Sequence, residues 1–149
     1  MRGNYYDIAM SDLHFAKIGI ETNLVTGIEG YNSCAAGFAQ AGEKFLKYLF
    51  ILFNIPFEAR LKETHNLNVL LRELIKDFPE LKALTTQCRF LNDFYIEARY
   101  PGENFEWVDN NTAKLCYDYT MDIKAGVDGV IENPAYEKRM QEALLNKYK

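Results

Sequence analysis

One long segment, from Tyr31 to Asn54, constrains the fold of this chain more than any other feature. Its apolar side chains recur three and four residues apart, the spacing that places residues on one face of an α-helix. The stripe consists of Ala35, Phe38, Ala39, Gly42, Phe45, Leu46, Leu49, Leu52 and Phe53. Small residues in the first half let another helix approach closely, and bulky ones fill the wider end. The segment therefore predicts a long core helix that ends at Ile55-Pro56, because the residue before a proline disfavours the helical conformation.

The same spacing recurs in four other segments. Helices are expected from about Asn4 to Ile20, from Thr64 or Asn66 to Phe78, from Leu81 to Tyr100, and from Asn111 to Ile131. A charged connector, residues 58–64, separates the second helix from the third, and no alternation typical of strands occurs. We therefore predict an all-α, antiparallel up-and-down bundle of four to five helices over residues 1–132. A short C-terminal tail, helical or partly disordered, follows over residues 133–149.

Charge and composition exclude several classes of protein. The net charge of −4 argues against non-specific binding along duplex nucleic acid, but it does not exclude a small phosphate site. Cys34, Cys88 and Cys116 show no zinc spacing, so we expect them to be small core residues. The N-terminal residues lack the apolar core of a signal peptide, and the longest apolar run, residues 48–53, is too short to span a bilayer. These features favour a cytoplasmic protein without a membrane anchor.

The segment from Leu91 to Pro101 is the best candidate for a functional site. Asn92, Tyr95 and Arg99 are three and four residues apart, so a continuous helix places them on one face. A buried arginine must pair with a carboxylate, reach water or meet an anion such as phosphate. The candidate ligand-binding residues in this region are Asn92, Asp93, Tyr95, Arg99 and Tyr100. Residue spacing leaves two interpretations open, a packed polar network and a phosphate site.

Two further polar groups have the same ambiguity. On the core helix, Gln40, Glu43, Lys44 and Lys47 follow one another at helical spacing. They either contact a phosphate or partner, with Lys44 and Lys47 as the binding residues, or form a solvated face with a Glu43–Lys47 pair.

The second group is Arg60 and His65, which stand five residues apart. An arginine that stabilises charge and a histidine that moves a proton can together cleave a phosphodiester, whereas a histidine at a helix start also serves as a capping or packing residue. No metal-binding set, phosphate loop or dinucleotide fingerprint occurs, so we expect no metal and no cofactor.

Four segments in this order resemble a HEPN domain (higher eukaryotes and prokaryotes nucleotide-binding), closest to its standalone bacterial and archaeal branch. The segments are Asp7-Ile8-Ala9 with Asp12-Leu13 and Ala16-Lys17, then Ala39 to Lys47, then Thr64 to Leu67 with Leu70-Leu71, and finally Leu91 to Tyr95 with Arg99 to Pro101. The resemblance implies a helical bundle that commonly forms homodimers. Members are often encoded beside, or fused to, a minimal nucleotidyltransferase. Some bind nucleotides, and others are RNA-cleaving toxins with an Arg-x4–6-His motif.

The toxin motif is the point where this sequence departs from the family. In the toxins it lies toward the end of the fourth helix, as Arg-Asn followed by His-x-Tyr. Here Leu91 replaces the arginine, Asn92 matches, and no histidine follows. Arg60 and His65 fit the spacing but precede the third helix. The resemblance thus favours a non-catalytic nucleotide- or phosphate-binding module, a homodimer that acts with a nucleotidyltransferase-type partner.

Two other functions remain open. One is a metal-independent RNase toxin of a toxin–antitoxin pair, with Arg60 and His65 as catalytic residues and RNA as the substrate. The other is a helical interaction scaffold without a small-molecule ligand. Its partner surface would consist of the aromatic loop from Phe105 to Trp107 and the basic tail.

Overall fold

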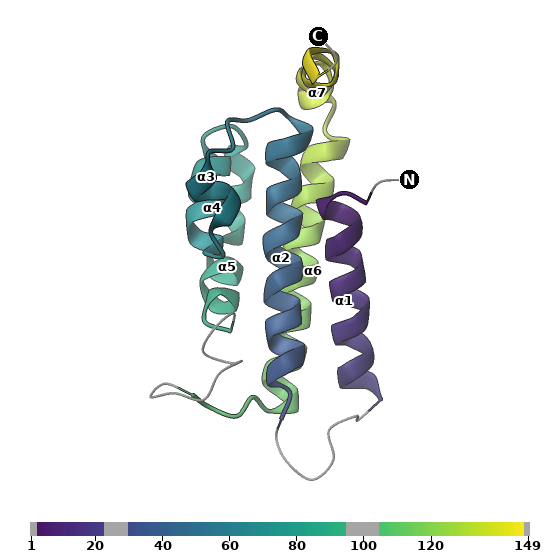
Figure 1. Cartoon of the computed structure of the whole chain (residues 1–149), viewed down its shortest axis with the longest axis vertical. Helices are drawn as coiled ribbons and strands as arrows, with labels where there is room; N and C mark the ends of the chain where they lie inside the picture. The colour runs from purple at the N-terminus through teal and green to yellow at the C-terminus, as the bar shows by residue number, and fades with distance from the viewer. Residues whose placement is uncertain (1–2, 23–29, 95–104, 148–149) are drawn as a thin grey trace.

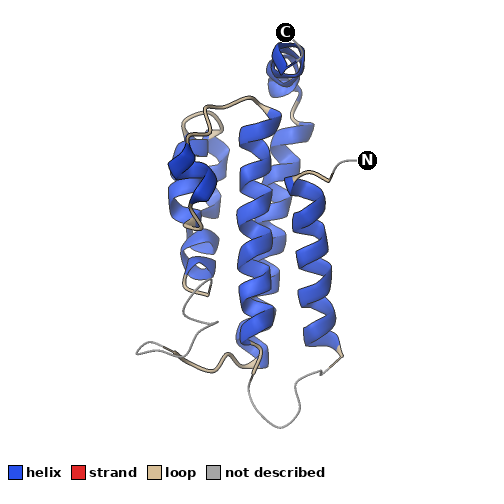
Figure 2. Cartoon of the chain, in the orientation of Figure 1, coloured by secondary structure: helices blue, strands red, loops and turns tan. Residues whose placement is uncertain are grey.

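A computed structural model describes residues 3–22, 30–94 and 105–147, and this part of the chain contains helices and no strand (Figure 2). The helices are α1 (Tyr5–Glu21), α2 (Asn32–Leu52), α3 (Ala59–Glu63), α4 (Leu67–Ile75), α5 (Thr85–Asn92), α6 (Asn110–Glu132) and α7 (Pro134–Lys147). A 3-10 helix, η1 (Pro79–Leu84), precedes α5. The prediction of an all-α helical bundle is therefore confirmed.

Helix α2 is the centre of the bundle. It packs against α1, α4, α5, α6 and α7, with α1 on one side and the group from α3 to α5 on the other (Figure 1). Its large apolar residues are completely or almost completely buried: Phe38, Phe45, Leu46, Leu49 and Phe50. Since each such side chain stabilises the fold by about 1.5–3 kcal/mol relative to an exposed one, α2 carries much of the core.

The small residues of α2 allow close packing within the chain. A methyl group added to Gly37 would lie 3.2 Å from Ala16 Cβ of α1, and one added to Gly42 would lie 3.2 Å from Ile123 Cδ1 of α6. Both distances are shorter than ordinary contacts between carbon atoms. Both glycines of α2 thus lie close to neighbouring helices of the same molecule.

The ends of the long helices follow local rules. After α2, Asn54 adopts a positive φ of 51°, and the N–H groups of Asn54 and Ile55 donate to the carbonyls of Ile51 and Phe50. These two bonds form a Schellman motif, which satisfies carbonyls that the helix leaves without partners. At the start of α4 the side chain of Asn66, rather than Thr64, accepts from the N–H groups of Asn68 and Val69.

The predicted fourth helix differs from the structure. The segment divides into η1 and α5, and α5 ends at Asn92, followed by a turn at Asp93 and Phe94. The side-chain oxygen of Asn92 accepts from the Leu67 N–H at 2.9 Å, so this residue joins the start of α4. The predicted site residues Tyr95, Arg99 and Tyr100 lie outside the described residues.

The charged connector also differs from the prediction, because it contains α3. The single large apolar residue of this short helix, Leu61, is buried, while its charged neighbours Arg60 and Lys62 are exposed. One large apolar residue among charges has no periodicity, so the sequence pattern did not indicate a helix here.

Asp109, the N-cap of α6, gives the fold a specific pH dependence. Its Oδ1 accepts from the Thr112 N–H at 2.7 Å, and this hydrogen bond lowers the pKa of the Asp109 carboxyl. The ionised carboxyl therefore stabilises the folded state near neutral pH. This contribution is lost as the pH falls through the folded-state pKa of Asp109, which lies below the usual value of about 3.9.

Asp109→Asn tests this pH dependence, because asparagine keeps a capping side chain but does not titrate. The free energy of unfolding of both proteins is measured in urea at neutral pH and near pH 3. Wild type should be more stable than the variant at neutral pH, and this difference should shrink in acid. A difference that does not change with pH would contradict the role of the Asp109 carboxylate.

Candidate functional site

Three side chains form a connected polar cluster between α2 and the link from α3 to α4. Glu43 Oε1 lies 2.7 Å from His65 Nδ1, and Glu43 Oε2 lies 3.3 Å from Lys47 Nζ. Lys47 also donates to the backbone carbonyl of Lys62 at 2.8 Å. We call Glu43, Lys47 and His65 the Glu43 cluster. It ties one face of α2 to the residues that lead into α4.

The Glu43 cluster consists of a buried ion pair and a half-exposed imidazole. The side chains of Glu43 and Lys47 are only 6% and 4% exposed, whereas that of His65 is 49% exposed. A buried carboxylate requires a counter-charge and hydrogen bonds, which Lys47 and His65 supply. Because an ionised carboxylate only accepts, His65 Nδ1 must carry the hydrogen that it donates to Glu43. The carboxylate therefore fixes the orientation of a half-exposed imidazole, an arrangement that proteins use to position histidines for binding and catalysis.

The start of α4 lies beside this cluster and is already hydrogen-bonded. The N–H of Leu67 donates to Asn92 of α5, and the next two N–H groups donate to the Asn66 side chain. These bonds satisfy the first donors of α4 and hold α5 against it. Any ligand at this place is therefore expected to bind through side chains rather than through the helix N-terminus.

The predicted site residues lie in different places. Lys47 and Asn92 contact opposite ends of the link between α3 and α4, at the Lys62 carbonyl and the Leu67 N–H. Lys44 forms an ion pair with Asp12 of α1, on the other side of α2 (Figure 1). Asp93 is exposed in the turn after α5. The described structure therefore brings Lys47 and Asn92 to the same region and separates Lys44 from both.

Arg60 is paired with carboxylates. Its Nε lies 3.3 Å from Glu58 Oε2, and its Nη2 lies 3.7 Å from Glu73 Oε1. The side chain is 63% exposed, so solvent screens both pairs. No ion pair or hydrogen bond of the described residues connects Arg60 with His65, whose described carboxylate partner is Glu43.

The cysteines match the expectation for core residues at two of three positions. Cys88 and Cys116 are completely buried, and burial raises the pKa of each thiol to about 12. Cys34 is partly exposed, and burial also raises its pKa. At neutral pH these groups are thiols rather than nucleophilic thiolates. Among the described residues, no group of three or more histidine, cysteine or acidic side chains could hold a metal ion.

Comparison with known proteins gives one match. A family model described as the HEPN domain matches residues 4–128 of the 149-residue chain. No curated protein and no solved structure matches. Within the part of the chain that the structure describes, no helix is both long and apolar enough to cross a membrane.

Proposed function

This chain belongs to the HEPN domain family, and from that membership we propose that it is a non-catalytic module that binds a nucleotide or another phosphate-bearing ligand beside His65. The supporting observation is the Glu43 cluster. Glu43 holds His65 through Nδ1 at 2.7 Å, while Lys47 balances the carboxylate. A phosphate oxygen needs a hydrogen-bond donor, which an imidazolium at this half-exposed position would provide through a strong, charge-assisted bond.

The state of Arg60 supports binding rather than cleavage. Arg60 lies beside Glu58 and Glu73, and none of the described ion pairs or hydrogen bonds joins it to His65. A metal-independent ribonuclease would need that charge beside the scissile phosphate. The position where family toxins carry the motif arginine is occupied by Leu91, which is completely buried.

The proposal includes a homodimer that acts with a nucleotidyltransferase-type partner. This part rests on family membership alone. Light scattering on the purified protein measures its molar mass, and a homodimer predicts twice the mass of one chain. A monomer at micromolar concentration would remove the homodimer from the proposal.

Calorimetric titration tests the proposed site. The purified protein is titrated with ATP, GTP and a short single-stranded RNA without added metal, and saturable nucleotide binding is expected. His65→Ala should weaken it by about 10- to 100-fold, the value of a charge-assisted hydrogen bond. Lys44→Ala is the matched control, because this lysine is paired with α1, and it should bind as wild type does. Arg99→Ala tests the arginine that the sequence pattern indicates as a ligand-binding residue, and weaker nucleotide binding is expected if that prediction is correct.

Two outcomes would overturn the proposal. Metal-free RNA cleavage that disappears in both Arg60→Ala and His65→Ala would establish the ribonuclease alternative. The absence of binding to all three ligands, with a folded wild-type protein, would favour the scaffold alternative.

A further inference from the structure

The residues before α6 are fixed to the start of α2 by a buried asparagine. The side-chain amide of Asn32 donates to the Glu106 carbonyl at 2.8 Å, and its oxygen accepts from the Val108 N–H at 2.9 Å. The N–H of Tyr31 also donates to the Val108 carbonyl at 3.1 Å. Asn32 and Val108 are both buried. Three hydrogen bonds therefore hold the backbone on both sides of residue 107.

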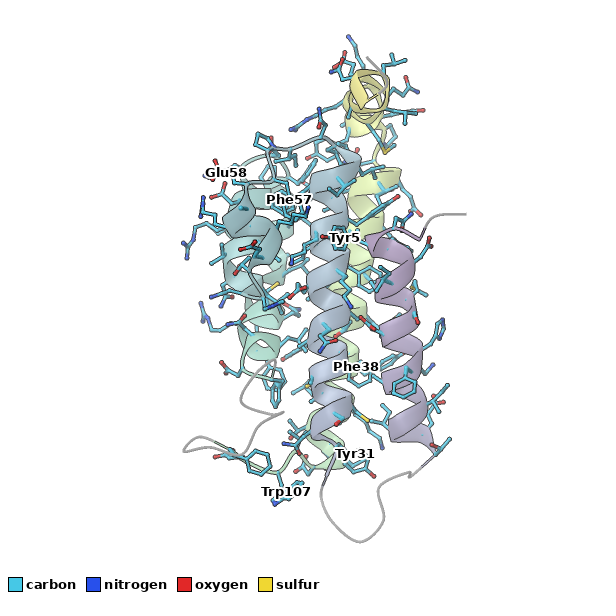
Figure 3. The ribbon with its side chains drawn as sticks, in the orientation of Figure 1. Tyr5, Tyr31, Phe38, Phe57, Glu58 and Trp107 are labelled. Atoms are coloured by element: carbon cyan, nitrogen blue, oxygen red, sulfur yellow. The ribbon has the colours of Figure 1, made fainter. Side chains whose placement is uncertain are left out.

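This anchored backbone presents an exposed tryptophan next to a partly buried phenylalanine. Trp107, between the two anchored residues, is 59% exposed, and its ring lies edge-to-face with Phe105 at a centroid distance of 5.1 Å. Trp107 lies near the end of the bundle opposite α7 (Figure 3). Exposure of a large aromatic side chain is unfavourable by itself, and aromatic residues are enriched where proteins meet partners. Because the backbone is already fixed, binding here would cost little ordering of the segment.

The charged residues closest to the pair in the sequence are acidic. Every charged residue between Arg99 and Lys114 is an acid, namely Glu103, Glu106 and Asp109, of which Glu103 lies outside the described residues. Glu106 is exposed directly beside Trp107. Acidic neighbours repel the phosphates of a nucleic acid, whereas the face of an indole ring attracts cations.

We propose that Trp107 and Phe105 form a docking surface for an arginine-containing segment of a partner protein. The planar guanidinium stacks on an aromatic face and can pair with Glu106 at its edge. The lysine ammonium has the same charge, but it is compact and strongly hydrated, so it gains less from contact with an aromatic face. This surface is separate from the Glu43 cluster, and the inference does not depend on the proposed nucleotide binding.

The chain contains a single tryptophan, so its fluorescence reports this surface directly. The probes are hexa-arginine amide and hexa-lysine amide, which carry equal charge. Hexa-arginine should change Trp107 emission saturably and bind about two- to fivefold more tightly than hexa-lysine.

Calorimetry with variants separates stacking from general attraction to an acidic protein. Trp107→Leu should remove the preference for arginine, and Glu106→Gln should weaken hexa-arginine binding. Glu132→Gln removes an exposed acid at the far end of α6 and should have no effect. Equal binding of both peptides, unchanged in Trp107→Leu, would overturn the proposal. So would a saturable change in Trp107 emission with single-stranded RNA that hexa-arginine does not displace, because the occupant would then be a nucleic acid.

Discussion

Replacement of Glu43 by leucine should lower the free energy of unfolding by about 3–5 kcal/mol, as expected when one partner of a buried ion pair is removed. The Lys47 side chain is 4% exposed, and in the variant its described polar contact is the Lys62 carbonyl. An ammonium group in that environment lacks a counter-charge. Urea denaturation followed by circular dichroism measures the change, because urea does not screen charges as a salt does.

The double variant Glu43→Leu/Lys47→Met distinguishes the cost of an orphaned charge from the value of the pair. Buried ion pairs replaced by apolar residues of similar volume often leave stability unchanged or higher. We therefore expect the double variant to lie within about 1 kcal/mol of wild type, so that the two substitutions are strongly non-additive.

An exposed pair on α1 provides the control for this cycle. Lys17 and Glu21 lie 3.6 Å apart, also four residues apart in sequence, with side chains 40% and 58% exposed. Glu21→Gln should change stability far less than Glu43→Leu, because solvent already screens this pair. Equal effects at the two sites would contradict the burial of Glu43. A double variant as unstable as the single one would show that the links to His65 and Lys62 dominate the cluster.

The long helices were predictable because their determinants are local. Apolar periodicity located α1, α2 and α6 to within one or two residues of their observed ends. Local capping bonds are also present at two helix starts: the side chain of Asn4 accepts from the Asp7 N–H, and that of Asn66 accepts from the Asn68 N–H. Both effects involve residues within four positions of each other, which a single sequence displays.

Neither the division into η1 and α5 nor the end of α5 at Asn92 could be predicted from apolar spacing. Leu81 and Leu84 in η1 are three residues apart, a spacing that 3-10 and α-helices share. The stripe therefore continues through Cys88 and Leu91 without a visible break. Asn92 ends α5 while it binds the Leu67 N–H of another helix, and no local pattern encodes that bond.

The sequence indicated part of the Glu43 cluster, but neither its burial nor its contact with His65. One of the two interpretations of the spacing was a solvated face with a Glu43–Lys47 pair; the pair is present, but both side chains are buried. The pair is covered by α3 and by the link from α3 to α4, which place the Lys62 carbonyl and His65 against α2. Lys44 is one residue from Glu43, about 100° around the helix, and so it faces α1 instead.

The second large effect is expected at Phe78, which joins α7 to the bundle. This side chain is completely buried and follows the end of α4. Its ring lies 4.8 Å from that of Phe53 and 5.0 Å from that of Tyr136 in α7, and the Arg139 guanidinium lies 5.5 Å from its centre. Phe78→Ala should cost about 3–5 kcal/mol in global stability, the usual range for a buried phenylalanine.

Hydrogen exchange distinguishes this variant from an ordinary core truncation. The remaining polar links of α7 to the bundle include the bond from Tyr136 to Glu80 and the ion pair of Arg139 with Asp77, and all of these side chains are at least partly exposed. Without the Phe78 ring, α7 amides should exchange by local opening while α2 amides still require global unfolding. Phe38→Ala is the matched control, because Phe38 is equally buried but packs on Tyr117 and not on α7. If both variants lowered protection of α7 and α2 in parallel, α7 would be part of the same cooperative unit as the core rather than a helix whose docking depends on Phe78.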